Sequence, residues 1–139
     1  MKKTKELIAL LTIFLTLFGG CSAEKPSQPV ETTQATVTYE QISQSEAKRL
    51  METEKNYVII DARTPEEFAQ AHIEGAILIP EYEISQRAEA ELPDKDQLIL
   101  VYCRSGRRSK IASQALAESG YSNVKEFGGI IDWQYEIVK

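Results

Sequence analysis

The feature that most constrains the fold is an uninterrupted apolar run, LILVY, at residues 98–102. A second short run, YVII, occupies residues 57–60. Runs of this length without polar interruption are typical of strands that are covered on both faces. Such strands occur in parallel sheets with helices packed on either side. The two runs therefore favour an α/β fold.

Segments with helical signals separate the predicted strands. Thr64 is a good N-cap, Pro65 suits the first helical position, and two glutamates follow in the first turn. Ser43 can cap an earlier helix, with Glu46 as its capping-box partner, and Gly120 can end a later one. The predicted helices span residues 41–54, 84–92, 110–118 and 130–135, and a further helix opens at residues 64–67. The further strands span residues 76–79 and 124–127. This alternation predicts a parallel sheet with helices on both faces.

Length and composition limit the classes of function that the chain can have. A chain of 139 residues corresponds to one domain, and its net charge of −5 gives it an acidic character. A nucleic-acid-binding domain would carry a basic face, so we expect no nucleic-acid partner. Two Cys and one His are too few for a four-ligand zinc site built from these residue types. We therefore expect no metal.

The first twenty residues have the pattern of a secretory signal. Three lysines precede an apolar run of 12 residues at positions 7–18, shorter than the about 18–20 needed to span a bilayer. Gly19 and Gly20 then lead directly to Cys21, which resembles a bacterial lipoprotein signal in which the Cys becomes the lipidated N-terminus. An uncleaved N-terminal anchor and a plain signal peptide are the alternatives. We predict a signal peptide at residues 1–20 and an extracytoplasmic protein anchored to a membrane through Cys21, at the cell surface or in the periplasm.

Residues 22–38 are polar, contain two prolines and show no apolar periodicity. A segment of this composition cannot bury enough surface to fold alone, so we expect residues 21–38 to form a flexible tether. An extended strand on the domain is the alternative for residues 37–39. The folded domain then spans residues 39–139. With Cys21 lipidated, Cys103 remains as a free thiol rather than half of a disulfide.

The loop that follows the LILVY strand carries the candidate chemistry. Its sequence at residues 103–109 is CRSGRRS, and in open parallel sheets ligands bind beyond the carboxyl ends of the strands. Gly106 can take a positive φ, so the backbone N–H groups can form an anion-binding nest at the start of the next helix. Four cations follow Cys103 within seven residues and should favour its thiolate. A Cys packed as a small apolar side chain is the structural alternative, but an apolar site would not be built among these charges.

With these features the chain resembles the rhodanese family of sulfurtransferases. The resemblance covers nearly all of residues 39–139 and rests on four motifs in order. These are DARTPEEF at residues 61–68, HIEGA at residues 72–76 leading to Ile79 and Pro80, the Cys103 loop, and FGGIIDW at residues 127–133. Ala71 departs from the family, which usually has Gly before the His, and this should affect a turn rather than the chemistry.

The resemblance implies a parallel sheet of about five strands and a catalytic Cys103 that holds a transferred sulfur as a persulfide. It implies an anionic small-molecule donor such as thiosulfate, an acceptor such as cyanide or a thiol, and no metal or organic cofactor. We expect the protein to act as a monomer. The positive charge and the N–H donors of the loop would bind both the donor and the persulfide. The residues that would do so are Arg104, Ser105, Gly106, Arg107, Arg108 and Ser109.

Two other functions are compatible with part of this pattern. Cell-cycle phosphatases share the fold but place five residues between the Cys and the Arg that clamps phosphate. Here that position is Ser109, and the shorter spacing to Arg108 suits a sulfur atom better than a phosphoryl group or arsenate. A non-catalytic rhodanese module that binds a partner or senses oxidants is the second alternative. Such modules commonly lack the Cys.

Three polar residues outside the loop need an assignment. His72 is expected to bond structurally in a turn before the strand at residues 76–79, rather than to pair with Cys103. Asp61 and Arg63 follow the YVII strand and are expected to pair with each other or with neighbours. Because Arg63 lies at the carboxyl end of a strand, it is also a candidate for the crevice that contains Cys103.

Overall fold

The computed structural model describes residues 36–139. The predicted signal, Cys21 and most of the predicted tether lie outside the described residues. Within residues 36–139, no helix is both long enough and apolar enough to cross a membrane.

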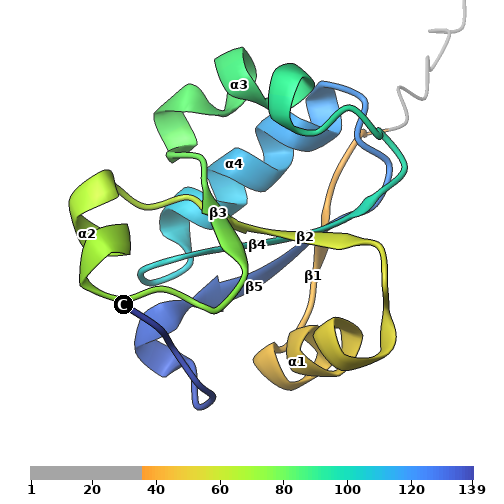
Figure 1. The fold of residues 1–139 in the computed structure, drawn as a ribbon. Coiled ribbons are helices and arrows are strands. Elements are labelled where there is room, and N and C mark those ends of the chain that lie inside the picture. The colour runs from red at the N-terminus through yellow and green to blue at the C-terminus, as the bar shows by residue number, and fades with distance from the viewer. Residues whose placement is uncertain (1–35) are drawn as a thin grey trace, which may run out of the picture. The chain divides into compact units, whose positions relative to one another are not determined.

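Five parallel strands form one sheet in the order β1-β5-β4-β2-β3 (Figure 1). This confirms the predicted α/β fold. The two apolar runs, β2 (Tyr57–Asp61) and β4 (Leu98–Cys103), are neighbours near the middle of the sheet. The other strands are β1 (Glu40–Gln41), β3 (Ala76–Leu78) and β5 (Val124–Gly129).

Helices cover both faces of the sheet, as Figure 1 shows. On one face α3 (Ile84–Glu91) and α4 (Arg107–Glu118) pack over Ile60, Ile99 and Val101. On the other face α1 (Gln44–Thr53) packs over Ile59, Leu100 and Tyr102. Successive strand residues point to opposite faces, so β4 supplies side chains to both cores and is buried along its whole length. The remaining helical segments are α2 (Pro65–Gln70), η1 (Glu81–Glu83) and η2 (Ile130–Asp132).

Both predicted N-caps form, but the capping box is complete only at α2. At α2, Thr64 accepts from the N–H of Glu67 while the Glu67 carboxylate accepts from the N–H of Thr64, which completes a capping box. At α1, Ser43 caps through the N–H of Glu46 at 3.1 Å. The Glu46 carboxylate binds Arg49 instead of reaching back, so the box predicted there is only half formed.

Several element boundaries differ from the prediction; the helix predicted at residues 41–54, for example, is Gln44–Thr53, because Gln41 lies in β1. Three further differences have a clear structural cause. Helix α4 begins at Arg107 rather than at residue 110, because Gly106 adopts a left-handed φ of 96° and lets the helix start inside the basic loop. The predicted helix at residues 130–135 is one 3-10 turn that ends at Asp132, after which the chain is extended and Val138 pairs with His72. The strand before α1 is Glu40–Gln41, not residues 37–39, because pairing with β5 selects those two residues.

Candidate active site

Cys103 is the last residue of β4, at the carboxyl end of the sheet, where the sequence places it. Its thiol is free and the residue is buried, with an exposed fraction of 1%. The backbone N–H of Gly106 donates to Sγ over 3.1 Å. The loop therefore folds back over its own sulfur.

Hydrogen-bond donors around the sulfur favour its anionic form. Burial by itself raises the pKa of the Cys103 thiol, but hydrogen bonds from the Ser109 hydroxyl and from the N–H groups of Ser109, Gly106 and Ser105 outweigh it. The net effect is a pKa below the usual thiol value. The same donors can also bind another anionic group placed at the centre of the loop.

Two glycines allow the loop and β5 to approach each other closely. A Cβ built on Gly129 would lie 2.2 Å from the Arg104 carbonyl oxygen, a distance at which no side chain fits. The register between β4 and β5 shifts between Val101 and Cys103, so Cys103 pairs with Gly129. The N–H of Ile131 then donates to the Arg104 carbonyl over 3.2 Å. The FGGIIDW motif thus packs directly against the loop.

The three loop arginines have different surroundings. Arg104 and Arg107 are exposed at the rim of the loop, together with Ser105. Arg108 is half-buried and makes two hydrogen bonds to Glu67 of α2, over 2.7 and 2.9 Å. Arg104 and Arg107 are therefore the arginines that present charge to solvent, whereas Arg108 joins α4 to α2.

Arg63 lies in a buried pair instead of in the crevice proposed for it. Its guanidinium binds the Asp61 carboxylate over 2.6–3.0 Å and donates to the Ala71 carbonyl over 2.7 Å. The residue is 5% exposed. The Tyr102 hydroxyl completes the group by donating to Asp61 over 2.6 Å. Asp61 and Arg63 therefore have the structural role predicted for them, because the Arg63 guanidinium forms its hydrogen bonds to Asp61 and Ala71 inside the domain.

His72 also has the structural role that we expected. Its ring lies 3.8 Å from the Phe68 ring, nearly parallel to it, and Nδ1 lies 3.0 Å from the Phe68 carbonyl oxygen. Its backbone exchanges two hydrogen bonds with Val138. Among residues 36–139, no group of three or more His, Cys, Asp or Glu side chains is placed to hold a metal ion.

One buried polar residue beside the loop was not predicted from the sequence. Glu126 of β5 is 3% exposed and accepts a hydrogen bond from the Ser109 hydroxyl over 2.6 Å. The available signal was its spacing, because Glu126 is two residues after Val124 and so shares the core-facing side of a strand.

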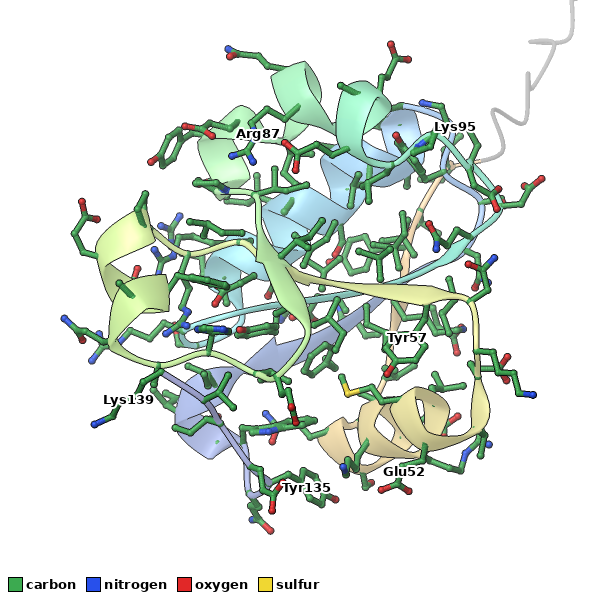
Figure 2. The ribbon with its side chains drawn as sticks, in the orientation of Figure 1. Glu52, Tyr57, Arg87, Lys95, Tyr135 and Lys139 are labelled. Atoms are coloured by element: carbon green, nitrogen blue, oxygen red, sulfur yellow. The ribbon has the colours of Figure 1, made fainter. Side chains whose placement is uncertain are left out.

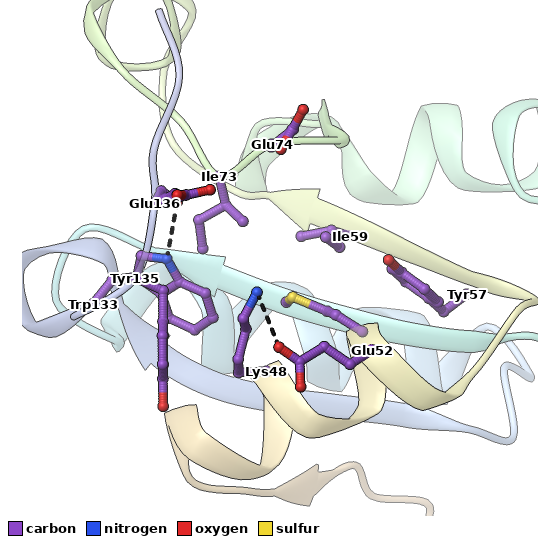
Figure 3. Close-up of a pocket in the computed structure, with 10 residues that line it drawn as sticks. Lys48, Glu52, Tyr57, Ile59, Ile73, Glu74, Trp133, Tyr135 and Glu136 are labelled. Carbon is purple, nitrogen blue, oxygen red and sulfur yellow. Dashed lines mark hydrogen bonds and ion pairs between the residues drawn. The ribbon is translucent and has the colours of Figure 1, made fainter.

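A separate pocket of about 150 Å³ lies on the α1 side of the sheet (Figure 3). Trp133 and Tyr135 from the C-terminal segment form one wall, and the Lys48–Glu52 ion pair of α1 lies opposite them. In Figure 2 the labelled side chains of Glu52, Tyr57 and Tyr135 lie on the same side of the sheet as α1. The pocket contains no residue of the Cys103 loop.

Comparisons with known proteins agree with this geometry. Residues 43–136 match the Rhodanese-like domain family. Thiosulfate sulfurtransferase PspE of Escherichia coli strain K12 is 44% identical over 73 residues, which is 52% of this chain and 70% of PspE. A sulfurtransferase of Allochromatium vinosum is 42% identical over 92 residues, 66% of this chain and 83% of that protein.

Solved structures give the same result for the fold. A structure described as a rhodanese with anions from E. coli superposes with a TM-score of 0.57 at 41% identity, covering 60% of this chain and 98% of that one. A rhodanese-related protein from Thermoplasma volcanium gives a TM-score of 0.60 at 28% identity, covering 72% and 98% of the two chains.

Proposed function

Because the chain belongs to the rhodanese-like domain family and is a sulfurtransferase, we propose that it transfers sulfur through a persulfide on Cys103. The observation that carries this proposal is the hydrogen bond of the Gly106 N–H to Sγ, within a loop whose donors lower the pKa of the thiol. A nucleophile of this kind needs no separate general base.

The proposed donor is an anion with a transferable outer sulfur, such as thiosulfate. The Cys103 thiolate attacks the outer sulfur and forms a new S–S bond, while the S–S bond within thiosulfate breaks and its electron pair leaves with sulfite. An acceptor nucleophile, cyanide or a thiolate, then attacks the outer sulfur of the persulfide and releases the Cys103 thiolate. No net oxidation and no cofactor are needed in either step.

Positive charge at the rim supports an anionic donor. Attack of a thiolate on a dianion is opposed by charge repulsion, which nearby cations reduce. Arg104 and Arg107 are exposed at the rim and supply this charge. Ser105 and Gly106 contribute backbone N–H groups toward the sulfur, and these groups would hold the persulfide anion after transfer.

The intact mass of the protein tests the persulfide directly. After treatment with thiosulfate, we expect the mass to increase by one sulfur atom and to return to its starting value when cyanide is added. Cys103→Ser should show neither change, and its rate of thiocyanate formation should fall to background. Cyanolysis at the wild-type rate in Cys103→Ser would refute the proposal, and faster hydrolysis of an aryl phosphate than sulfur transfer would favour the phosphatase alternative.

We also infer that the protein works outside the cytoplasm while attached to a membrane by lipid on Cys21. The support is the order of the N-terminal sequence: three lysines, a short apolar run, two glycines and Cys21. Two or three acyl chains would provide a stable anchor, since each buried methylene contributes about 0.8 kcal/mol.

A further inference from the structure

Positive charge in and just after the Cys103 loop is not balanced by neighbouring carboxylates. Most other basic side chains within residues 36–139 pair with an acid; Lys95, for example, pairs with Glu89, a carboxylate that is 81% exposed. Among the same residues, no ion pair is formed by three exposed basic side chains, which are Arg104, Arg107 and Lys110. Unpaired charge of one sign on an otherwise acidic chain attracts a partner of the opposite sign.

These basic side chains lead into an apolar groove on α4. Arg107, Lys110 and Ile111 are three and four residues apart, so they lie on one face of the helix. Ile111 is a large apolar side chain that is 45% exposed. It lines a groove of about 430 Å³ together with Tyr39, Lys110, Gln114, Ala115 and Glu118. Glu118, the one acid among them, accepts a hydrogen bond from Gln114 over 2.9 Å.

We propose that this surface docks an acidic segment of the protein that accepts sulfur from Cys103. We call it the α4 surface, and it consists of Arg104, Arg107, Lys110 and the groove beside Ile111. Acidic side chains of the partner would pair with the three cations, and an apolar side chain next to them would enter the groove. This inference names the class of acceptor for the proposed function and rests on the Cys103 persulfide for its meaning in catalysis.

The position of the α4 surface suits an acceptor that carries its own thiol. Cys103 is 1% exposed, so a thiol has to reach the transferred sulfur across the rim that Arg104 and Arg107 form. There it gives up its proton to solvent, and its thiolate attacks the outer sulfur of the persulfide. A new S–S bond forms on the acceptor, while the S–S bond to Cys103 breaks and its electron pair returns to the Cys103 thiolate.

The extent of the α4 surface favours a protein over the other anions that positive charge attracts. From Arg107 to Ala115 it follows the helix for about 12 Å, further than one small inorganic dianion can contact. An anionic membrane could cover the same length, but it would also cover the loop and separate the sulfur from its donor. A protein segment can dock, take the sulfur and dissociate.

Two peptides of equal length test the docking without any sulfur transfer. Both contain leucine, and both carry serine in place of the acceptor cysteine; one has Asp and Glu where the other has Asn and Gln. In the full chain labelled with nitrogen-15, we expect the acidic peptide to shift amide signals of residues 104–115. It should bind about tenfold more tightly than the neutral peptide at low salt, as three exposed ion pairs imply, and the difference should shrink as salt is added. Equal binding of the two peptides would overturn the proposal.

Substitutions on the surface of the domain show where the peptide binds. Lys110→Glu should abolish the preference for the acidic peptide, and Ile111→Ser should weaken the binding of both peptides. Lys55→Glu is the matched control, because this exposed lysine precedes β2 at the edge of the sheet opposite to Cys103 and has no ion pair within residues 36–139. Equal losses in Lys110→Glu and Lys55→Glu would reduce the effect to net charge and overturn the proposal, and unchanged binding in Ile111→Ser would overturn the assignment of the groove.

Two other occupants of the α4 surface are distinguished by the same variant. Binding to phosphatidylglycerol vesicles that Lys110→Glu weakens, without a preference between the peptides, would assign the surface to a membrane. A wild-type dimer that Lys110→Glu dissociates would assign it to a second copy of the chain. Either result would overturn the proposal.

The transfer step is measured separately, with cysteine restored in both peptides. Protein treated with thiosulfate should pass sulfur to the acidic peptide about tenfold faster than to the neutral one at low salt, and Lys110→Glu should lose this preference. Preferential binding without faster transfer would refute the acceptor role. If neither peptide gains sulfur while the binding preference persists, the persulfide proposal fails and the docking surface stands.

Discussion

At the scale of single residues, the Tyr102 hydroxyl links two segments that are distant in sequence. It donates to Asp61 over 2.6 Å and accepts from the N–H of Ile73 over 3.1 Å. Burial, reinforced by the negative charge of Asp61, raises the pKa of Tyr102, so the hydroxyl keeps its hydrogen at all physiological pH values. It is therefore a permanent donor to the buried Asp61–Arg63 pair.

Tyr102→Phe should destabilise the domain because it leaves the Ile73 N–H without its buried partner and removes one of the donors to Asp61 Oδ2. We expect a loss of about 1–3 kcal/mol in the free energy of unfolding, measured by urea denaturation. Tyr82→Phe is the matched control, because Tyr82 is 62% exposed and its hydroxyl should contribute little. Equal stability of the two variants would show that the Tyr102 hydroxyl has no structural role.

At the scale of elements, α2 and α4 are joined by Glu67 and Arg108. Glu67 caps its own helix and also accepts two hydrogen bonds from Arg108. The hydrogen bonds from Arg108 are the main reason that the pKa of Glu67 falls to about 2, with a further contribution from the N–H of Thr64. An arginine that the sequence offers as a ligand for substrate is thus also a connection between two helices.

The low pKa of Glu67 makes part of the stability depend on pH. Its folded pKa is below its unfolded value of about 4.3, so the contribution is fully present above that value and is lost as the pH falls toward 2. Glu67→Gln should therefore be less stable than wild type at pH 7, with a difference that shrinks between about pH 5 and 2. Urea midpoints measured across this range test the prediction, with Glu89→Gln as a control. A difference that stays constant with pH would contradict it.

The elements themselves were predictable where the local signals were strong. Both apolar runs are strands, Thr64 and Pro65 begin a helix, and Gly120 follows the end of α4 with a left-handed φ of 91°. The start of α4 was not predictable from the charge pattern, because a cluster of arginines is typical of a loop. The helix begins within this cluster because Gly106 turns the chain into it. The segment η2 ends after one turn, and Trp133, which follows it, packs against Phe127 at a ring distance of 5.5 Å.

At the scale of the whole molecule, both core clusters and the Cys103 loop lie within residues 39–139. A lipid on Cys21 would therefore determine where the enzyme works without taking part in the chemistry. The full chain has a net charge of −5, and against this acidic background the exposed Arg104 and Arg107 form a local basic site.

Cys21→Ser should separate location from activity. Without the thiol that would carry lipid, we expect the protein to lose incorporation of labelled palmitate and to move from the membrane fraction to the soluble fraction. Its rate of thiocyanate formation from thiosulfate and cyanide should stay at the wild-type level. Ser22→Ala, which leaves the Cys in place, is the control. Membrane association that persists in Cys21→Ser would favour an uncleaved N-terminal anchor.

The sequence by itself determined the fold class, the position of Cys103 and the anion-binding character of its loop. These features depend on short-range patterns: apolar runs, helix caps, and a Cys followed by Gly and four cations within a few residues. Only the tertiary structure decided which partners the polar side chains take. Arg108 meets Glu67 from 41 residues away, and Ser109 meets Glu126 from 17 residues away. Such contacts depend on strand register and on the packing of helices across the sheet, which no local pattern specifies.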